Sequence, residues 1–391
     1  MGTRAGAFLG AVALAAGLVA PASANEDPVK IGFMATMSGP PGVLGKHLYD
    51  GFRLGLEKAG NEMGGRPVEV ILVDDELKPD YAVTKAQELI SRDQVDFVTG
   101  LIFSNILMAV FRPITESETF VIGANAGTST IAGRRCSPYF FSVSWQNDQV
   151  HEVMGKYAAD NNLERVFLLA PNYQAGRDAV SGFERHFKGE VVDTVYTPLN
   201  NLDFSAELAR IASAEPDAVF TFMPGGMGVN LVKQFRQAGL ADKVKFLSAF
   251  TVDEATMVAT QDDALGLFGS SQWAMDLDNA ANKEFFENFL AAYDYLPSHY
   301  AAQGYDAALL IASAVNAVGG DLSDKDAVRE ALKAADFSSV RGDFSFNTNH
   351  FPVQDFYLTQ AVKNDDGQYV MSAVEKVFDD YGDVYAADCR M

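Results

Sequence analysis

Short apolar runs alternate with stretches of helical periodicity along most of the chain after residue 28. Runs rich in β-branched and aromatic residues favour strands, and here they occupy residues 29–37, 68–73, 95–99, 120–123, 166–170, 191–196, 218–223 and 244–249. Most of the gaps hold one amphipathic stretch, as in Leu44, Leu48, Phe52 and Leu56. Such repeated strand and helix winding predicts an α/β fold with parallel sheets.

The segments between the predicted strands contain signals for helix starts, and the pattern becomes mainly helical after residue 282. We expect helices to begin near Pro79, Asn105, Asn147, Gly176, Asp203 and Met227. Residues 282–335 are predicted to be almost wholly helical, since Phe285 and Phe289 begin a fourfold apolar spacing. Further on, two strand-like runs flank Asp365-Asp366-Gly367, a turn signal that predicts a terminal β-hairpin.

The first residues have the composition of a secretory signal peptide. Arg4 provides a positive start, residues 7–20 form an apolar run, and Ala22-Ser23-Ala24 matches the small-residue cleavage pattern. We expect cleavage after Ala24 and no membrane insertion, because the run is shorter than a spanning helix requires. The remaining 367 or so residues exceed the usual size of one core, so two lobes are expected.

Charge and cysteine content narrow the partners. The chain has 52 acidic and 30 basic residues and a formal charge of −22, which disfavours nucleic acid and anionic lipid as partners. An exported chain with two cysteines, Cys136 and Cys389, most simply forms one disulfide; two unpaired thiols are the alternative. Two cysteines are too few for a structural zinc site.

Motifs for catalysis or cofactor binding are incomplete. Residues 40–46 look like a phosphate loop but begin with proline, and His151-Glu152 lacks the second histidine of a metalloprotease pattern. The stretch 127–131 lacks the last glycine of a serine-hydrolase elbow, and Asp74-Asp75-Glu76 is expected to be a solvated loop. We therefore predict no enzyme activity, no cofactor and no metal, and we expect every histidine to be an ordinary surface or packing residue.

Several short segments together carry a family resemblance. They are Ile31-Gly32-Phe33, Met37-Ser38-Gly39-Pro40, the stretch from Gly51 to Leu56, Val73-Asp74-Asp75 and Asp203-Phe204-Ser205. As an ordered set over about residues 29–369, the chain resembles the leucine/isoleucine/valine-binding proteins of bacterial ABC importers, which are type I periplasmic binding proteins.

The resemblance implies two doubly wound lobes joined by a three-strand hinge. We expect hinge crossings near residues 142–146, 271–274 and 350–354. The N-terminal lobe would then comprise residues 28–143 plus 275–351, and the C-terminal lobe residues 144–274 plus 352–391. A disulfide between Cys136 and Cys389 would bridge the lobes close to this hinge.

The resemblance also implies a ligand site between the lobes. The ligand carboxylate would be held by the loop with Ser104 and Asn105 and by the loop with Asn125, Ala126 and Thr128. Amino-acid binders place an acidic residue after a second-lobe strand to pair with the ligand ammonium, and here that position holds Phe250. An ammonium would lose its charge pairing there, whereas an apolar ring would gain buried area.

Further aromatic residues, Tyr173, Trp273 and Tyr305, are expected near the cleft edges. The pattern is similar to the branch that binds aromatic carboxylates such as benzoate derivatives and phenylpropanoids. The hypothesis is thus a periplasmic, monomeric solute-binding protein that delivers a small aromatic carboxylate to ABC transporter permease subunits. A branched-chain amino acid or amide binding protein of the same fold is the alternative. A membrane-bound sensor or a DNA-binding regulator would need a spanning segment or a DNA-binding helix, and the sequence suggests neither.

Overall fold

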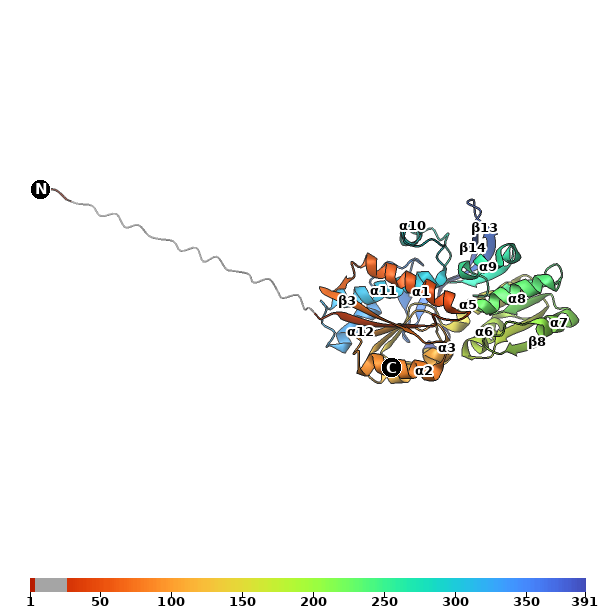
Figure 1. Ribbon diagram of the computed structural model, residues 1–391, viewed down its shortest axis with the longest axis horizontal. Helices are drawn as coiled ribbons and strands as arrows, with labels where there is room; N and C mark the ends of the chain where they lie inside the picture. The colour runs from red at the N-terminus through yellow and green to blue at the C-terminus, as the bar shows by residue number, and fades with distance from the viewer. Residues whose placement is uncertain (4–26) are drawn as a thin grey trace.

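The computed structural model describes residues 1–3 and 27–391. The expected signal segment, residues 1–24, lies almost entirely outside the described residues. The rest forms two α/β units that lie side by side, one with α1, α2, α3, α11 and α12 and the other with α6, α7 and α8 (Figure 1).

The first unit contains a six-stranded sheet in the order β2-β3-β1-β4-β5-β6. Its pairs are parallel except β2 with β3. The strands are β1 (Val29–Ala35), β2 (Glu62–Met63), β3 (Arg66–Asp74), β4 (Phe97–Gly100), β5 (Phe120–Gly123) and β6 (Phe140–Ser142). The helices are α1 (Gly42–Lys58), α2 (Pro79–Ser91), α3 (Ser104–Thr115), α4 (Ser129–Ala132), α10 (Ala280–Ala292), α11 (His299–Ala317) and α12 (Lys325–Ala334).

Two glycines allow α1 and α11 to pack backbone against backbone. A Cβ on Gly51 would lie 1.9 Å from the carbonyl oxygen of Ala301, and one on Gly304 would lie 2.0 Å from that of Leu48. Any larger side chain at either position would force the helices apart. This contact ties a late segment of the chain to the first unit, because α1 and α11 are far apart in sequence.

The second unit contains an eight-stranded sheet in the order β12-β13-β11-β10-β9-β7-β8, with β14 pairing β13. Its strands are β7 (Arg165–Pro171), β8 (Glu190–Thr197), β9 (Ala218–Thr221), β10 (Lys245–Ser248), β11 (Phe268–Ser271), β12 (Ser345–Phe346), β13 (Pro352–Lys363) and β14 (Tyr369–Tyr381). The helices are α5 (Asn147–Asp160), α6 (Gln174–His186), α7 (Ser205–Ala214), α8 (Gly226–Gln237) and α9 (Glu254–Thr260). The antiparallel pair β13 and β14 confirms the predicted terminal hairpin.

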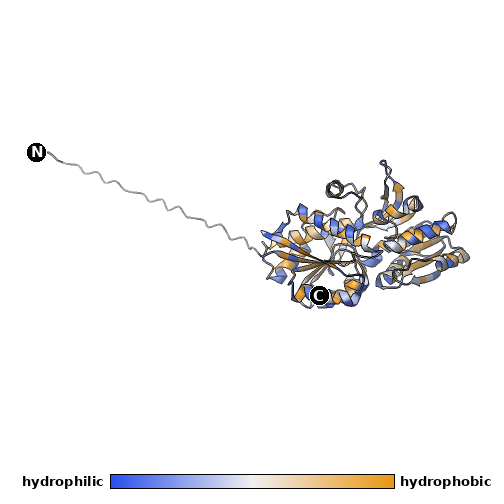
Figure 2. Cartoon of the chain, in the orientation of Figure 1, coloured by the Kyte–Doolittle hydropathy of each residue, from blue (hydrophilic) through white to orange (hydrophobic). Residues whose placement is uncertain are grey.

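Apolar residues gather on the strands and on the helix faces turned toward them, while polar residues face outward (Figure 2). The central strands β4 and β5 are buried along their whole length, as expected for parallel strands covered on both faces. The predicted α/β winding is therefore confirmed. One expectation was wrong: Asp75 is buried rather than solvated. Its Oδ1 accepts from the Thr36 hydroxyl at 2.5 Å, so the carboxylate fastens the end of β3 to the end of β1.

The chain passes between the elements of the two sheets at three places. It runs from β6 into α5, from β11 into α10, and from α12 into β12 and β13. The first and third connections are hydrogen-bonded: Ser142 N donates to His350 O at 3.0 Å, and Gln354 Nε2 donates to Ser144 O at 2.6 Å. The expected crossings at residues 142–146 and 271–274 follow β6 and β11, and the one at 350–354 lies between β12 and β13. The hinge and the residue limits of the lobes stay a prediction.

The C-terminal segment returns to the connections between the units. Cys136 and Cys389 form a disulfide across 253 residues of sequence, as predicted. The phenol of Tyr385 donates to Asp148 Oδ2 at 2.8 Å, on α5. The segment therefore contacts the first unit through the disulfide and the second unit through α5.

Candidate functional site

A pocket lies between the two units, where several strands end. Ser104 follows β4, Asn125 follows β5, Tyr173 follows β7, and Phe250 follows β10. Ligands of open α/β sheets bind at such carboxyl ends. The central pocket encloses about 360 Å³ of space between atoms and is lined by Ile102, Phe103, Ser104, Asn125, Ala126, Trp145, Asn147, His151, Tyr173, Ala175, Phe222, Pro224, Phe250 and Tyr300.

Five of the nine residues proposed from the sequence line this pocket: Ser104, Asn125, Ala126, Tyr173 and Phe250. The structure places the other four elsewhere. Thr128 is buried as the N-cap of α4, where its hydroxyl accepts from Ile131 N at 3.3 Å. Asn105 is half-buried in the first turn of α3.

Trp273 and Tyr305 pack in a separate apolar cluster. Both rings contact Phe285, at centroid distances of 6.2 and 4.9 Å. The indole nitrogen of Trp273 donates to Asn282 Oδ1 at 2.7 Å. These contacts hold α10 and α11 together, and neither ring lines the central pocket. Trp273 instead borders the neighbouring cavity that Phe250 also lines, and a ligand role for Trp273 and Tyr305 stays a prediction.

One end of the central pocket is polar. The hydroxyl oxygen of Ser104 accepts from Asn147 Nδ2 at 3.2 Å, which leaves the hydroxyl hydrogen to be donated. Ser104 is the first residue of α3, whose N-terminus has no capping side chain. The free amides of a helix N-terminus attract anions. This end of the pocket therefore suits a carboxylate, without any cationic side chain in the lining.

The side-chain amide of Asn125 has its nitrogen bonded and its oxygen unpaired. Its Nδ2 donates to Ile102 O at 2.7 Å, and its buried Oδ1 has no hydrogen-bond partner among the described residues. The unpaired oxygen offers a ligand an acceptor, and one of the two Nδ2 hydrogens is already used by Ile102 O. The Ser104 hydroxyl and the start of α3 offer donors for a carboxylate.

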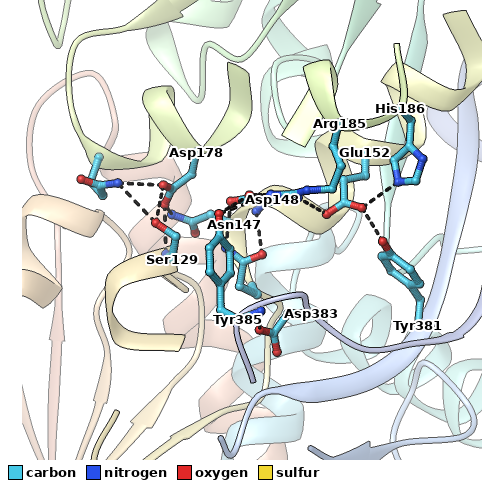
Figure 3. A network of polar contacts seen from close by, with 12 residues as sticks. Ser129, Asn147, Asp148, Glu152, Asp178, Arg185, His186, Tyr381, Asp383 and Tyr385 are labelled. Atoms are coloured by element: carbon cyan, nitrogen blue, oxygen red, sulfur yellow. Dashed lines mark hydrogen bonds and ion pairs between the residues drawn. The ribbon is translucent and has the colours of Figure 1, made fainter. Parts of the chain in front are cut away.

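Asn147 joins the polar end of the pocket to both units, and Figure 3 shows it beside Asp178 and Ser129. Besides Ser104, its Nδ2 contacts Asp178 Oδ2 on α6 at 2.9 Å, and its Oδ1 accepts from Gly127 N at 2.9 Å. Asp178 also accepts from the Ser129 hydroxyl at 2.7 Å. Burial raises the pKa of the Asp178 carboxyl. The contact between Ser129 and Asp178 therefore links α4 to α6 across the cleft, next to the pocket.

A second part of the same network lies along α5 (Figure 3). Arg185 pairs with Asp148 at 2.7 Å and with Glu152 at 2.5 Å, and both carboxylates are fully buried. Glu152 also accepts from Tyr381 and contacts His186. Removing the guanidinium would leave buried carboxylates uncompensated, so Arg185 fixes α6 against α5. Glu152 in turn ties α5 to Tyr381 at the end of β14.

The remaining walls of the central pocket are aromatic. Ring contacts run from Phe103 to Tyr173, on to Phe222 and His151, and then to Phe250 and Trp145, with centroids 4.4 to 6.3 Å apart. Burial raises the pKa of the Tyr173 phenol and lowers that of the His151 imidazole to about 3. Both groups are therefore neutral near pH 7, and the walls are aromatic and uncharged.

Two acidic residues lie behind the aromatic wall instead of in it. Phe250 also lines a neighbouring cavity of about 270 Å³, together with Asp253, Glu254 and His299. Asp253 caps α9, accepting from Thr256 N at 2.9 Å. Burial raises the pKa of Asp253 to about 6 and that of Glu254 to about 8. Neither carboxyl lines the central pocket, where an ammonium group would need one.

Sequence reasoning missed four important members of the lining: Trp145, Asn147, His151 and Tyr300. Asn147 was expected only as a helix start, and Trp145 only as part of a hinge crossing. The helical spacing of four between Asn147 and His151 was the signal that could have placed both on one face of α5.

Metal binding and membrane insertion find no support in residues 27–391. This part of the chain brings no three histidine, cysteine or acidic side chains together as a metal ion would require. None of its helices is both long and apolar enough to cross a bilayer.

These features define a binding protein with a pocket between two α/β units. The sequence model of the family described as "Periplasmic binding protein" matches residues 28–368. The chain therefore belongs to the periplasmic binding protein family, and it is a binding protein rather than an enzyme.

Known relatives agree over nearly the whole length. "Leu/Ile/Val-binding protein homolog 6" of Brucella melitensis is 29% identical, covering 95% of this chain and 97% of the relative. The solute-binding protein of an ABC transporter from R. palustris in complex with benzoate is 31% identical, with a TM-score of 0.88, covering 93% of this chain and all of that one. A second solute-binding protein of an ABC transporter from R. palustris, in complex with 4-hydroxybenzoate, is 29% identical, with a TM-score of 0.85. The match covers 91% of this chain and 98% of that one.

Proposed function

We propose that this chain is the extracytoplasmic solute-binding component of an ABC importer and that it captures a small aromatic carboxylate between its two units. The observation that carries the proposal is the division of the central pocket into an anion-binding end at Ser104 and an uncharged aromatic wall that ends at Phe250. The ring of an aromatic acid would bury its faces against this wall, and its carboxylate would receive hydrogen bonds.

The alternative, a branched-chain amino acid or amide, is favoured by the names of the Brucella relatives. An amino acid brings an ammonium group, which is costly to bury unless it is paired. Among the described residues that line the central pocket, none is acidic, and Asp253 and Glu254 lie beyond Phe250. This arrangement supports the aromatic acid over the amino acid.

The R. palustris proteins bound to benzoate and 4-hydroxybenzoate favour the same ligand class. Export through a signal peptide cleaved after Ala24, action as a monomer and delivery to permease subunits complete the proposal. Four of the nine residues proposed from the sequence lie outside the central pocket and would act by supporting its lining. They are Asn105, Thr128, Trp273 and Tyr305.

A thermal-shift screen tests the proposal. Benzoates, cinnamates and amino acids are added separately to the purified mature protein, and a ligand that binds only the folded state raises Tm. We expect aromatic acids to raise Tm and branched-chain amino acids to leave it unchanged. A shift produced by leucine or valine alone would favour the alternative.

A further inference from the structure

His151 is a histidine of the aromatic wall with an unpaired ring nitrogen. It lies on α5, lines the central pocket and is 2% exposed. Its Nδ1 is buried and has no hydrogen-bond partner among residues 27–391. Buried polar atoms are nearly always paired, so an unpaired nitrogen on a residue that lines a ligand pocket is a candidate partner for the ligand.

The surroundings of His151 keep the imidazole neutral. Its ring lies edge-on to Phe220, Phe222 and Phe250, at centroid distances of 5.7, 5.1 and 6.3 Å. Burial lowers its pKa to about 3. A neutral imidazole has one N–H donor and one lone-pair acceptor, and a hydroxyl group can pair with either nitrogen.

The helix sets how far apart Asn147 and His151 lie along the axis of α5. Asn147, whose amide contacts the Ser104 hydroxyl, precedes His151 by four residues on α5. Residues four apart lie on one face of a helix, one above the other, separated along its axis by about 6 Å. A benzene ring with a carboxyl carbon and an oxygen at opposite ends spans a similar length.

We propose that His151 determines specificity by hydrogen bonding to a hydroxyl group at the para position of the aromatic ring. The inference rests on the proposed function, because it requires the ligand carboxylate to lie at Ser104 and the start of α3. The ligand would then be a para-hydroxylated aromatic acid, and an acid without the hydroxyl would leave the imidazole unpaired.

Calorimetric titration of the wild type and His151→Phe with benzoate, 3-hydroxybenzoate and 4-hydroxybenzoate tests the inference. Phenylalanine keeps a ring in the wall and removes both nitrogens. In the wild type, 4-hydroxybenzoate should bind at least about tenfold more tightly than benzoate. In His151→Phe that ratio should fall to about one, and the affinity for benzoate should be unchanged or higher.

Two further variants, a control and a second substitution of His151, allow the test to be read even if His151→Phe fails to fold. His350→Phe is the matched control, because His350 is a buried histidine stacked on Phe141 at 4.0 Å outside the pocket. It should keep the wild-type ratio. His151→Gln retains a polar group at the site and should show an intermediate ratio.

The outcomes separate this inference from the proposed function. Equal loss of both acids in His151→Phe would overturn it, because His151 would then serve the carboxylate or the shape of the wall. A preference for 4-hydroxybenzoate that persists in His151→Phe would also overturn it and would point to Asn125 Oδ1. If the wild type binds benzoate and the hydroxybenzoates equally well, the role of His151 is contradicted but the proposed function stands. If no aromatic acid binds, the proposed function itself is contradicted.

Discussion

The indole of Trp145 stacks on the ring of Phe250, with centroids 4.4 Å apart and planes 28° apart. Trp145 belongs to the first connection between the units, and Phe250 follows β10 in the second unit. Phe250 has a φ of +52°, a left-handed conformation that costs a large residue about 1 to 3 kcal/mol. The ring of Phe250 also lies 4.5 Å from that of His299. These contacts hold the strained residue in the pocket wall.

Phe250→Ala should weaken the binding of benzoate by about 1 to 3 kcal/mol, because the apolar area that the ligand buries is lost. Phe250→Glu should abolish it, since a carboxylate would be enclosed without a partner. Calorimetric titration measures both, with Tyr305→Phe as a control outside the pocket. Unchanged affinity in Phe250→Ala would remove this residue from the site.

Ser104→Ala should weaken aromatic-acid binding by about 1.5 to 3 kcal/mol, the range for a hydrogen bond to a charged group. Thr128→Val offers a contrast, because Thr128 caps α4 and does not line the central pocket. It should lower Tm through the lost cap and change affinity less. Full affinity in Ser104→Ala would place the carboxylate elsewhere.

The disulfide should stabilise the fold through the long loop that it closes. For 253 residues of separation, the chain-entropy model gives about 5 kcal/mol. Replacing both cysteines by serine should lower the free energy of unfolding measured in urea by up to that amount. Mass spectrometry of the unreduced, digested protein should show Cys136 and Cys389 in one linked peptide, and free thiols on both would contradict the structure.

His151 should make the protein less stable in acid. Burial lowers its folded-state pKa from 6.5 to about 3, so between these values the unfolded chain binds the extra proton. Its contribution to stability is fully present above pH 6.5 and is lost as the pH falls toward about 3. His151→Phe should remove a slope of about 1.4 kcal/mol per pH unit in that window.

Urea unfolding of the wild type and His151→Phe at several pH values measures this slope without ligand. The carboxyl groups common to both proteins, including Glu254, cancel in the difference. Parallel stability curves between about pH 6 and pH 4 would show that the imidazole is protonated in the folded state.

The α/β winding and the terminal hairpin could be predicted because hydrophobic periodicity and turn residues act locally. The carboxyl ends of parallel strands also indicated Ser104, Asn125 and Phe250. The packing of Trp273 and Tyr305 could not be predicted in this way. Periodicity does not tell on which side of a connection a ring packs, and both rings joined Phe285 instead.

His151 and Asp75 show the same limit for polar residues. A single histidine gives no motif, and its role depends on Phe220 and Phe222, which follow it by about seventy residues in sequence. Asp75 looked solvated because its neighbours are acidic, yet the Thr36 hydroxyl gives it a buried partner. Both outcomes depend on tertiary contacts that no local pattern contains.

The most direct test is a calorimetric titration of the mature wild-type protein with benzoate and with leucine at neutral pH. The structure predicts that benzoate binds and that leucine does not, because the central pocket has an aromatic wall at Phe250 and no acidic side chain in its lining. Micromolar binding of leucine, with no binding of benzoate or any other aromatic acid, would contradict the proposed specificity.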